Sequence, residues 1–168
     1  TGGYITGYRG SPLGALDQQL WQAKRFIANN HIHFEPGVNE DLAATAIWGS
    51  QQLNLFPDAN YDGIFSMWYA KGPGVDRSGD VLRHGNLAGS SKHGGVLLLS
   101  GDDHTCKSST TAHQTEYAYT DATIPVLNPS GVQGFLAMAL YGRGTARFSG
   151  RRFPIQVIAE VPGVASYA

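Results

Sequence analysis

The sequence has one cysteine, Cys106, among its 168 residues. A single thiol excludes an internal disulfide, an all-cysteine zinc site and a self-contained iron–sulfur cluster within this chain. Low cysteine use fits a reducing, cytoplasmic setting, which is the location that we expect. Cys106 lies in a polar stretch with no base beside it in the sequence, so we expect no reactive thiolate there.

Strong net charge and long apolar runs are also missing. The 12 Lys and Arg residues against 13 Asp and Glu residues give a formal net charge of −1. This balance offers no electrostatic basis for binding nucleic acid or an anionic membrane. No apolar run approaches the roughly 18 residues of a membrane span, and no signal-peptide pattern is present. We therefore expect no nucleic-acid or membrane partner.

The common nucleotide-binding and hydrolase motifs are absent as well. Gly72-Pro73-Gly74 opens like a dinucleotide-binding fingerprint, but Arg77 occupies the position of the third glycine. Neither a Walker-type phosphate loop nor a G-x-S-x-G nucleophile elbow occurs. The sequence therefore gives no support to nucleotide binding by these loops or to an α/β-hydrolase.

Strand-like and helix-like stretches alternate along the chain. Short apolar runs predict strands at residues 4–8, 31–34, 63–69, 94–100, 124–127 and 153–159. Periodic stretches between them predict helices at residues 12–28, 39–55, 81–87, 113–120 and 131–142, with 143–152 as a polar turn. This alternation predicts an α/β fold with a doubly wound, mainly parallel sheet and helices on both faces.

The length fits one domain with a hydrophobic core of its own. The chain starts at Thr1 without an initiating methionine and stops at residues 164–168, directly after a strand-like run. We therefore expect residues 1–168 to be a single domain within a longer polypeptide.

Residues 35–52 form the most informative segment. A turn leads to Asn39, a residue type that often caps helices, so Glu40 and Asp41 are expected in the first helical turn. Their carboxylates then lie beside unpaired backbone N–H groups at the positive end of the helix dipole. Small side chains follow that would let another surface approach closely, at Ala43, Ala44 and Ala46. The simpler interpretation is that Glu40 and Asp41 only stabilise the start of the helix.

Polar loops follow four of the predicted strands. They comprise residues 8–12, 38–40, 70–74 and 101–104. The carboxyl ends of parallel strands meet at one edge of a sheet, where ligands bind in open α/β folds. We therefore expect the four loops to form one crevice that contains Glu40.

A metal site is one alternative for the last of these loops. Asp102, Asp103 and His104 offer carboxylate and imidazole ligands for a hard or borderline cation, which would suit a metal-dependent hydrolase. The other interpretation is that the two acids cap the next turn. The remaining histidines show no metal-ligand spacing, and we assign no metal to any residue. A non-catalytic interaction module on the same fold is a further alternative.

The ordered motifs resemble a known family. They are similar to the pyrimidine-binding domain of the thiamine-diphosphate-dependent 2-oxoacid:ferredoxin oxidoreductases, and most of all to the indolepyruvate branch of that family. The matching segments are Gly-Tyr-Arg-Gly-Ser-Pro-Leu-Gly at 7–14, Val-Asn-Glu-Asp-Leu-Ala-Ala at 38–44, Trp-Tyr-Ala-Lys-Gly-Pro-Gly-Val-Asp-Arg at 68–77, Gly-Asp-Asp-His at 101–104, His-Gln-Thr-Glu at 113–116 and Pro-Ser-Gly at 129–131. They occur in this order over nearly the whole chain.

The resemblance implies a catalytic role for Glu40. In that family a glutamate hydrogen-bonds N1′ of the cofactor's aminopyrimidine and favours its 4′-imino tautomer, which removes the C2 proton. The resulting ylide attacks the substrate carbonyl. The resemblance also places a stretch along the aminopyrimidine where glycine permits a close approach, namely Lys71, Gly72, Pro73 and Gly74.

Substrate binding is implied at Arg9, Ser11, Asp102 and His104. Ser11 is the expected donor to the 2-oxo group, in addition to capping a helix that begins at Pro12, and Arg9 is the expected partner of the substrate carboxylate. Pyruvate-specific members carry an arginine near the end of the fourth strand, where this chain has Gly101-Asp102. The resemblance therefore implies oxidative decarboxylation of indolepyruvate or another aryl 2-oxo acid to an acyl-CoA, with electrons passed to ferredoxin.

The resemblance leaves half of the family's cofactor site without a counterpart in this chain. The family's G-D-G…N-N segment for the diphosphate and Mg²⁺ does not occur, and neither does a cysteine set for a [4Fe–4S] cluster. The resemblance therefore implies that Mg²⁺ and the iron–sulfur clusters bind elsewhere in the enzyme. A diphosphate-binding domain would complete the site. Ferredoxin, coenzyme A and the 2-oxo acid are the other expected partners, and a dimer is the expected assembly.

Overall fold

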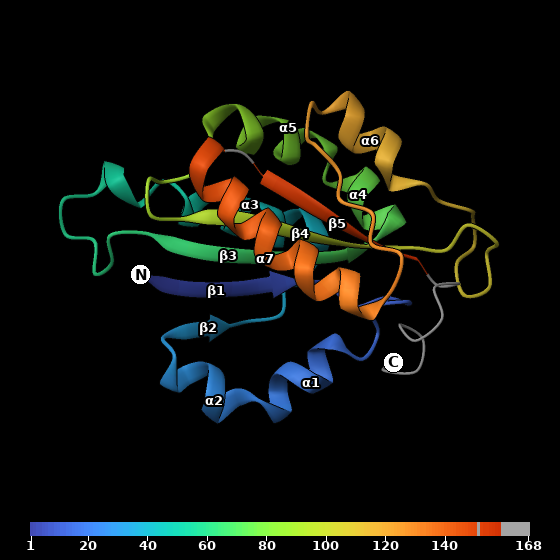
Figure 1. Ribbon diagram of the computed structural model, residues 1–168, viewed down its shortest axis with the longest axis horizontal. Coiled ribbons are helices and arrows are strands. Elements are labelled where there is room, and N and C mark those ends of the chain that lie inside the picture. The colour runs from blue at the N-terminus through green and yellow to red at the C-terminus, as the bar shows by residue number, and fades with distance from the viewer. Residues whose placement is uncertain (151, 159–168) are drawn as a thin grey trace.

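A five-stranded parallel sheet forms the centre of the computed structural model, which describes residues 1–150 and the backbone of residues 152–158 (Figure 1). The strands are β1 (Gly2–Gly7), β2 (Ile32–Phe34), β3 (Ile64–Lys71), β4 (Gly95–Asp102) and β5 (Arg152–Ile158), in the order β2-β1-β3-β4-β5. Every neighbouring pair is parallel. Because β2 and β3 lie on opposite sides of β1, the strand order reverses there, and such a switch point is where open α/β sheets bind ligands.

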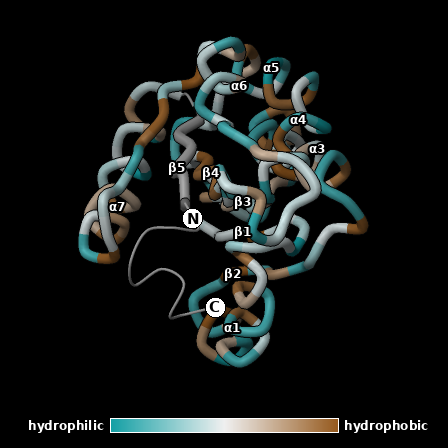
Figure 2. Tube along the Cα trace, turned by 90° about the vertical axis from the view of Figure 1, so that its right-hand side faces the viewer, coloured by the Kyte–Doolittle hydropathy of each residue, from teal (hydrophilic) through white to brown (hydrophobic). Residues whose placement is uncertain are grey.

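Helices cover both faces of this sheet. They are α1 (Leu16–Gln22), α2 (Lys24–Asn29), α3 (Glu40–Ser50), the short 3-10 helix η1 (Leu53–Leu55), α4 (Gly72–Arg77), α5 (Gly79–Ala88), α6 (Thr115–Asp121) and α7 (Val132–Ser149). Figure 2 shows α7 on one side of the strands, α3, α4, α5 and α6 on the other, and α1 beyond β2 at the edge. The expected α/β class, with a parallel sheet between helices, is therefore confirmed. Within the described residues, no helix combines the length and apolar character that crossing a bilayer would need.

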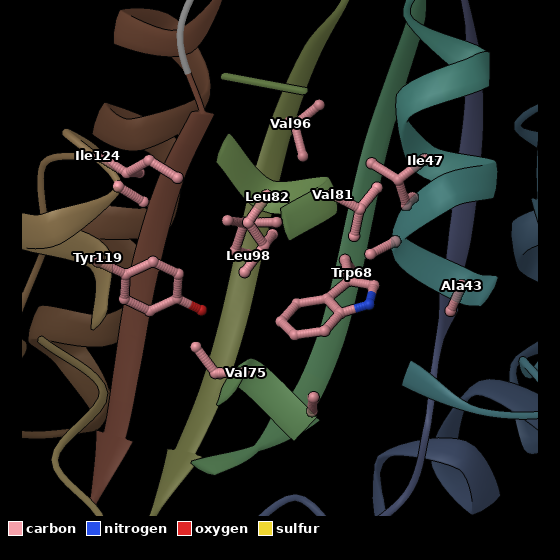
Figure 3. Close-up of a cluster of buried hydrophobic side chains, with 13 residues drawn as sticks. Ala43, Ile47, Trp68, Val75, Val81, Leu82, Val96, Leu98, Tyr119 and Ile124 are labelled. Carbon is pink, nitrogen blue, oxygen red and sulfur yellow. The ribbon is translucent and has the colours of Figure 1, made fainter. Parts of the chain in front are cut away.

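The main core lies between the sheet and the helices α3 to α6 (Figure 3). Its largest buried side chains come from β3, β4 and these helices, and include Trp68, Val96, Leu98, Ile47, Val75, Leu82 and Tyr119. A second core lies on the other face and contains Leu13, Tyr69, Leu97 and Leu99. Every residue of β4 is buried, as expected for a strand covered on both faces. The strands β3 and β4 are therefore the fixed frame from which the loops at their ends project.

The segment between β1 and β2 differs from the single helix expected over residues 12–28. Two short helices, α1 and α2, replace it, and neither has a side-chain cap. Ser11 does not cap a helix; it precedes Pro12 across a cis peptide bond, in a turn where the Leu13 N–H donates to the Gly10 carbonyl. Leu13 is buried in the second core, so a tertiary contact holds this stretch as a turn.

Residues 124–127 do not form the predicted strand. Only Leu127 makes an isolated bridge. The Ile124 N–H instead donates to the Tyr119 carbonyl, and the Ile124 side chain is buried in the main core. This segment therefore closes α6 onto the core and adds no strand to the sheet.

Helix α7 is longer than the sequence predicts. It continues through the expected polar turn to Ser149, and Gly150 ends it in the left-handed conformation that favours glycine. Gly142 and Ala146 are buried, so these small residues let the helix follow the sheet closely. The packing against the sheet thus extends a helix that its polar residues alone would end earlier.

Helix α3 is shorter than predicted and ends at Ser50, and the side chain of the next residue, Gln51, makes hydrogen bonds outside the helix. Its side-chain amide donates to the Ile64 carbonyl at 2.9 Å, and its side-chain oxygen accepts the Gly95 N–H at 3.0 Å. These bonds join the end of α3 to the beginnings of β3 and β4. A turn and η1 then cover residues 52–55 in place of further α-helix.

Gly7, the last residue of β1, should tolerate no side chain. A Cβ there would lie 2.2 Å from the Tyr69 carbonyl oxygen and 2.7 Å from the Tyr69 ring. Gly7→Ala should therefore lower the free energy of unfolding by about 1–3 kcal/mol or more, as overpacking does, measured by urea denaturation. The control Gly49→Ala adds a Cβ with nothing within 4 Å and should leave stability equal or up to about 1 kcal/mol higher. Equal stability of Gly7→Ala and the wild type would contradict this packing.

Candidate functional site

The carboxyl ends of β1, β3 and β4 lie side by side. Gly7 at the end of β1 pairs with Tyr69, and Lys71 at the end of β3 pairs with Gly101 of β4. The Gly37 N–H donates to the Gly7 carbonyl at 2.8 Å, which brings the chain before α3 to the same edge. The fold therefore gathers the stretches that follow β1, β3 and β4, together with the start of α3, at one edge of the sheet.

Glu40 is the first residue of α3, and two interactions fix its backbone. Asn39 caps the helix as predicted, because its side-chain oxygen accepts the Leu42 N–H at 2.9 Å. The Glu40 carbonyl oxygen accepts the indole N–H of Trp68, a fully buried residue of β3, at 3.0 Å. The start of α3 is thereby held to β3 and to the main core.

The side chain of Glu40 lies against Gly74 of α4. A Cβ at Gly74 would be 2.5 Å from Glu40 Cγ and 2.9 Å from Glu40 Oε1, so glycine leaves the room that this carboxylate occupies. Glu40 is partly buried, and its carboxylate makes no hydrogen bond or ion pair within the part of the chain that the structure describes. A carboxylate in this position is available to a ligand.

The alanines of α3 do not all face outward. Ala43 and Ala44 are buried in the main core together with Ile47, as the helical period places them on one face. The prediction that Ala43 and Ala44 leave room for another surface is therefore wrong. Ala46 is exposed and is the one of the three alanines that another surface can reach.

Lys71 and the loop after β1 pack on each other. A Cβ at Gly10 would lie 2.7 Å from Lys71 Cδ, and a Cβ at Gly101 would lie 2.7 Å from Pro12 Cδ. The loop therefore passes over the ends of β3 and β4. Arg9 and Ser11, which flank Gly10 and Pro12 in this loop, are exposed.

The chain passes from β3 directly into α4, although residues 70–74 are predicted as a loop. Lys71 ends the strand and precedes the helix, and Pro73 lies in the first helical turn. Proline is suited to this position, because the N–H groups of the first turn have no partner within the helix. Helical backbone thus takes the place of the loop. It is this turn that presents Gly74 to Glu40.

His113 borders the same turn from the other side. A Cβ at Gly72 would lie 2.4 Å from His113 Cβ, so the histidine rests directly on the start of α4. Its Nε2 lies 2.7 Å from Asp76 Oδ2. The residues around His113 in the sequence do not predict these contacts with α4. Among the sequence observations, only the resemblance of residues 113–116 to the family motif singles out this segment.

The two adjacent acids after β4 have different partners. Asp103 accepts hydrogen bonds from the backbone N–H groups of residues 107–109 and from the Ser108 hydroxyl. These bonds, the Ser108 N–H first, hold the pKa of Asp103 below its ordinary value. Asp102 is fully buried, and its Oδ2 accepts the N–H and the hydroxyl of Thr115 at 2.8 and 3.0 Å. The turn-capping interpretation is therefore correct for Asp103, while Asp102 ties α6 to the end of β4.

His104 lies beside Asp102, with 3.8 Å between His104 Nε2 and Asp102 Oδ2. Glu116 of α6 approaches the same place, and one ligand atom from each of these three residues lies within 4.8 Å of the others. Asp103 caps its loop instead of joining the cluster, so the trio predicted for a hydrolase does not form. Glu116 takes its place, a partner that the spacing of the loop residues does not reveal.

Two surface cavities lie away from the predicted site residues. One, of about 390 Å³, opens at the amino ends of β1 and β3 and is lined by residues that include Gly2, Tyr4, His31, His33, Tyr61 and Ile64. The other, of about 210 Å³, lies between α4, α5 and α6. Glu40, Ser11 and Lys71 line neither of them.

Comparisons with known proteins do not assign a function to this site. No protein-family model matches the chain. A search among curated proteins finds no similar protein either. A functional assignment therefore depends on the ordered motifs and on the geometry around Glu40.

Removing the helix cap beside Glu40 should destabilise the protein. Asn39→Ala loses the hydrogen bond to the Leu42 N–H and should lower the free energy of unfolding by about 1 kcal/mol. Asn39→Asp is the matched control, because it keeps the cap and adds negative charge at the positive end of the helix dipole, so its stability should be equal or higher. Urea denaturation of the three proteins measures the difference. An equal decrease in the free energy of unfolding in both variants would argue against a capping role for Asn39.

Proposed function

We propose that this domain binds the aminopyrimidine half of thiamine diphosphate in a 2-oxoacid:ferredoxin oxidoreductase. The proposed reaction is the oxidative decarboxylation of indolepyruvate or another aryl 2-oxo acid to an acyl-CoA. The observation that carries the proposal is the Glu40 carboxylate, which lies against Gly74 at the carboxyl edge of a parallel sheet and has no partner within the described residues. The strand order and the helices on both faces fit a doubly wound domain of the pyrimidine-binding type.

The surroundings of Glu40 suit a group that shares a proton with a ring nitrogen. The cap at Asn39 and the bond from Trp68 fix the backbone of Glu40, and Gly74 leaves space for its side chain. The backbone of Glu40 is therefore held in place, and its carboxylate has room to approach a ring nitrogen, which sharing a proton with that nitrogen requires. Bound thiamine diphosphate would supply the electron sink that decarboxylation needs.

The substrate residues are assigned from the same edge of the sheet. Arg9 and Ser11 are exposed on the loop that covers Lys71, where a guanidinium can pair with a carboxylate and a hydroxyl can donate to an oxo group. Asp102 is fully buried, whereas 28% of the His104 side chain is exposed. We therefore assign substrate contact to Arg9 and Ser11. Asp102 is too deeply buried to touch the substrate, and the partly exposed His104 lies beside it.

Exposed apolar side chains lie close to Glu40 in the chain and at the end of β1. Val38 is 82% exposed, Leu42 55% and Tyr8 41%. We infer that these three side chains lie on a surface that another domain covers. We assign this surface to the diphosphate-binding domain, which would hold Mg²⁺. The [4Fe–4S] clusters and the sites for ferredoxin and coenzyme A belong to other parts of a dimeric, cytoplasmic enzyme in this proposal.

Glu40→Gln tests the proposal in the enzyme assembled with its diphosphate-binding domain. Glutamine keeps the size of the side chain but cannot share the proton, so exchange of the C2 proton of the bound cofactor should slow by about 10²–10⁴-fold. Proton NMR in deuterated water follows this exchange. Near-normal exchange in Glu40→Gln would refute the assigned role.

Asp41→Asn is the matched control, because Asp41 lies in the same helical turn. It removes one negative charge from the start of α3 and should leave C2 exchange near the wild-type rate. Equal loss of exchange in both variants would indicate a disturbed helix instead of a role for Glu40.

Calorimetry tests the alternative of a non-catalytic interaction module. If the diphosphate-binding domain docks equally well with and without the cofactor, the interaction module is favoured.

A further inference from the structure

Three potential metal ligands meet beyond the end of β4. Asp102 ends the strand, His104 follows it, and Glu116 lies in the first turn of α6. One ligand atom from each lies within 4.8 Å of the other two. The two carboxylates and the imidazole come from two separate parts of the chain, so the cluster is a product of the fold.

Hydrogen bonds hold both halves of this cluster in place. Thr115 donates its N–H and its hydroxyl to Asp102 Oδ2, so the start of α6 is tied to β4 and Glu116 follows directly. Asp103 holds the backbone of residues 107–109, which fixes the loop that carries His104. The protein therefore sets the ligand positions itself, as supporting hydrogen bonds do around metal sites.

The contact between His104 and Asp102 is not an ordinary hydrogen bond. His104 Nε2 is buried and has no hydrogen-bond partner among the residues described, and its 3.8 Å separation from Asp102 Oδ2 is beyond hydrogen-bond range. Around an ion with bonds of about 2.0–2.2 Å, neighbouring ligand atoms lie about 3.0–3.5 Å apart. A small inward movement would let one ion contact both atoms and satisfy the buried nitrogen.

The burial of the three residues gives the cluster a base and an opening. Asp102 is fully buried, His104 keeps 28% of its side chain exposed, and Glu116 is partly buried. An ion would therefore enter from the side of His104 and Glu116 and meet Asp102 at the base. A cation there would offset part of the cost of burying the Asp102 carboxylate.

We propose that Asp102, His104 and Glu116 bind one divalent ion, Zn²⁺ or Mn²⁺. The imidazole suits Zn²⁺ better than Mg²⁺ or Ca²⁺, and the two carboxylates suit Zn²⁺ or Mn²⁺. Three protein ligands leave room for water on the ion. The ion ties the loop of residues 103–114 to β4 and α6. This site is separate from the Mg²⁺ that the proposed function places on another domain.

Metal binding by the purified protein tests the site. Isothermal titration with Zn²⁺ and with Mn²⁺ should show one equivalent bound, with weaker binding of Mg²⁺. His104→Gln and Glu116→Gln should each weaken binding about 10- to 100-fold, because each removes one of the three ligands. The matched control is His84→Gln. His84 Nε2 lies 3.5 Å from Asp80 Oδ1 in an exposed pair on α5, so its loss should leave the affinity unchanged.

A second measurement locates the ion without any variant. Bound Mn²⁺ should broaden the amide NMR signals of residues 102–104 and 115–117 first. Glu40→Gln should bind the metal as the wild type does, so a failure of the cofactor role does not affect this test. The proposal is overturned by a lack of stoichiometric binding, by equal affinities of the wild type and both cluster variants, or by broadening centred elsewhere.

Discussion

The hydrogen bond from the Trp68 indole to the Glu40 carbonyl joins the main core to the candidate site. Trp68 is fully buried on β3, the strand that pairs with both β1 and β4. Such a bond contributes about 1 kcal/mol net, and a buried donor left without a partner costs about 1–3 kcal/mol. The packing of the core therefore sets the position of the first turn of α3, and with it the position of Glu40.

Glycines then decide how closely the loops approach one another at this edge. Gly7 lies on the Tyr69 carbonyl, Gly74 on Glu40, and Gly10 on Lys71, and a Cβ at any of the three would clash. The contacts involve separate stretches of chain that meet at one edge of the sheet. They bring the loop after β1, the start of α3 and the start of α4 together at this edge, while apolar side chains such as Val38 remain exposed there. This arrangement suits a ligand held between this domain and a second one.

Local patterns predict the features that depend on local physics. The buried strand β4 follows from a short continuous apolar run, and Asn39 as a helix cap follows from its residue type. The edge of the sheet that carries Glu40 is therefore predictable from the sequence. The predictions are wrong where contacts between distant residues determine the structure. Leu13 is buried in the second core, where a helix start is expected, and Ile124 is buried in the main core, where a strand is expected. The approach of Glu116 to Asp102 likewise depends on how α6 docks on the sheet, which residue spacing does not encode.

The central claim is that Glu40 meets a ring nitrogen of the cofactor. Nitrogen NMR of thiamine diphosphate labelled at N1′, bound to the enzyme assembled with its diphosphate-binding domain, tests this most directly. The account predicts an N1′ signal displaced from that of the free cofactor, as a proton-sharing nitrogen gives. It also predicts a return to the free position in Glu40→Ala with the cofactor still bound. An N1′ signal in the wild type that matches the free cofactor would contradict the account.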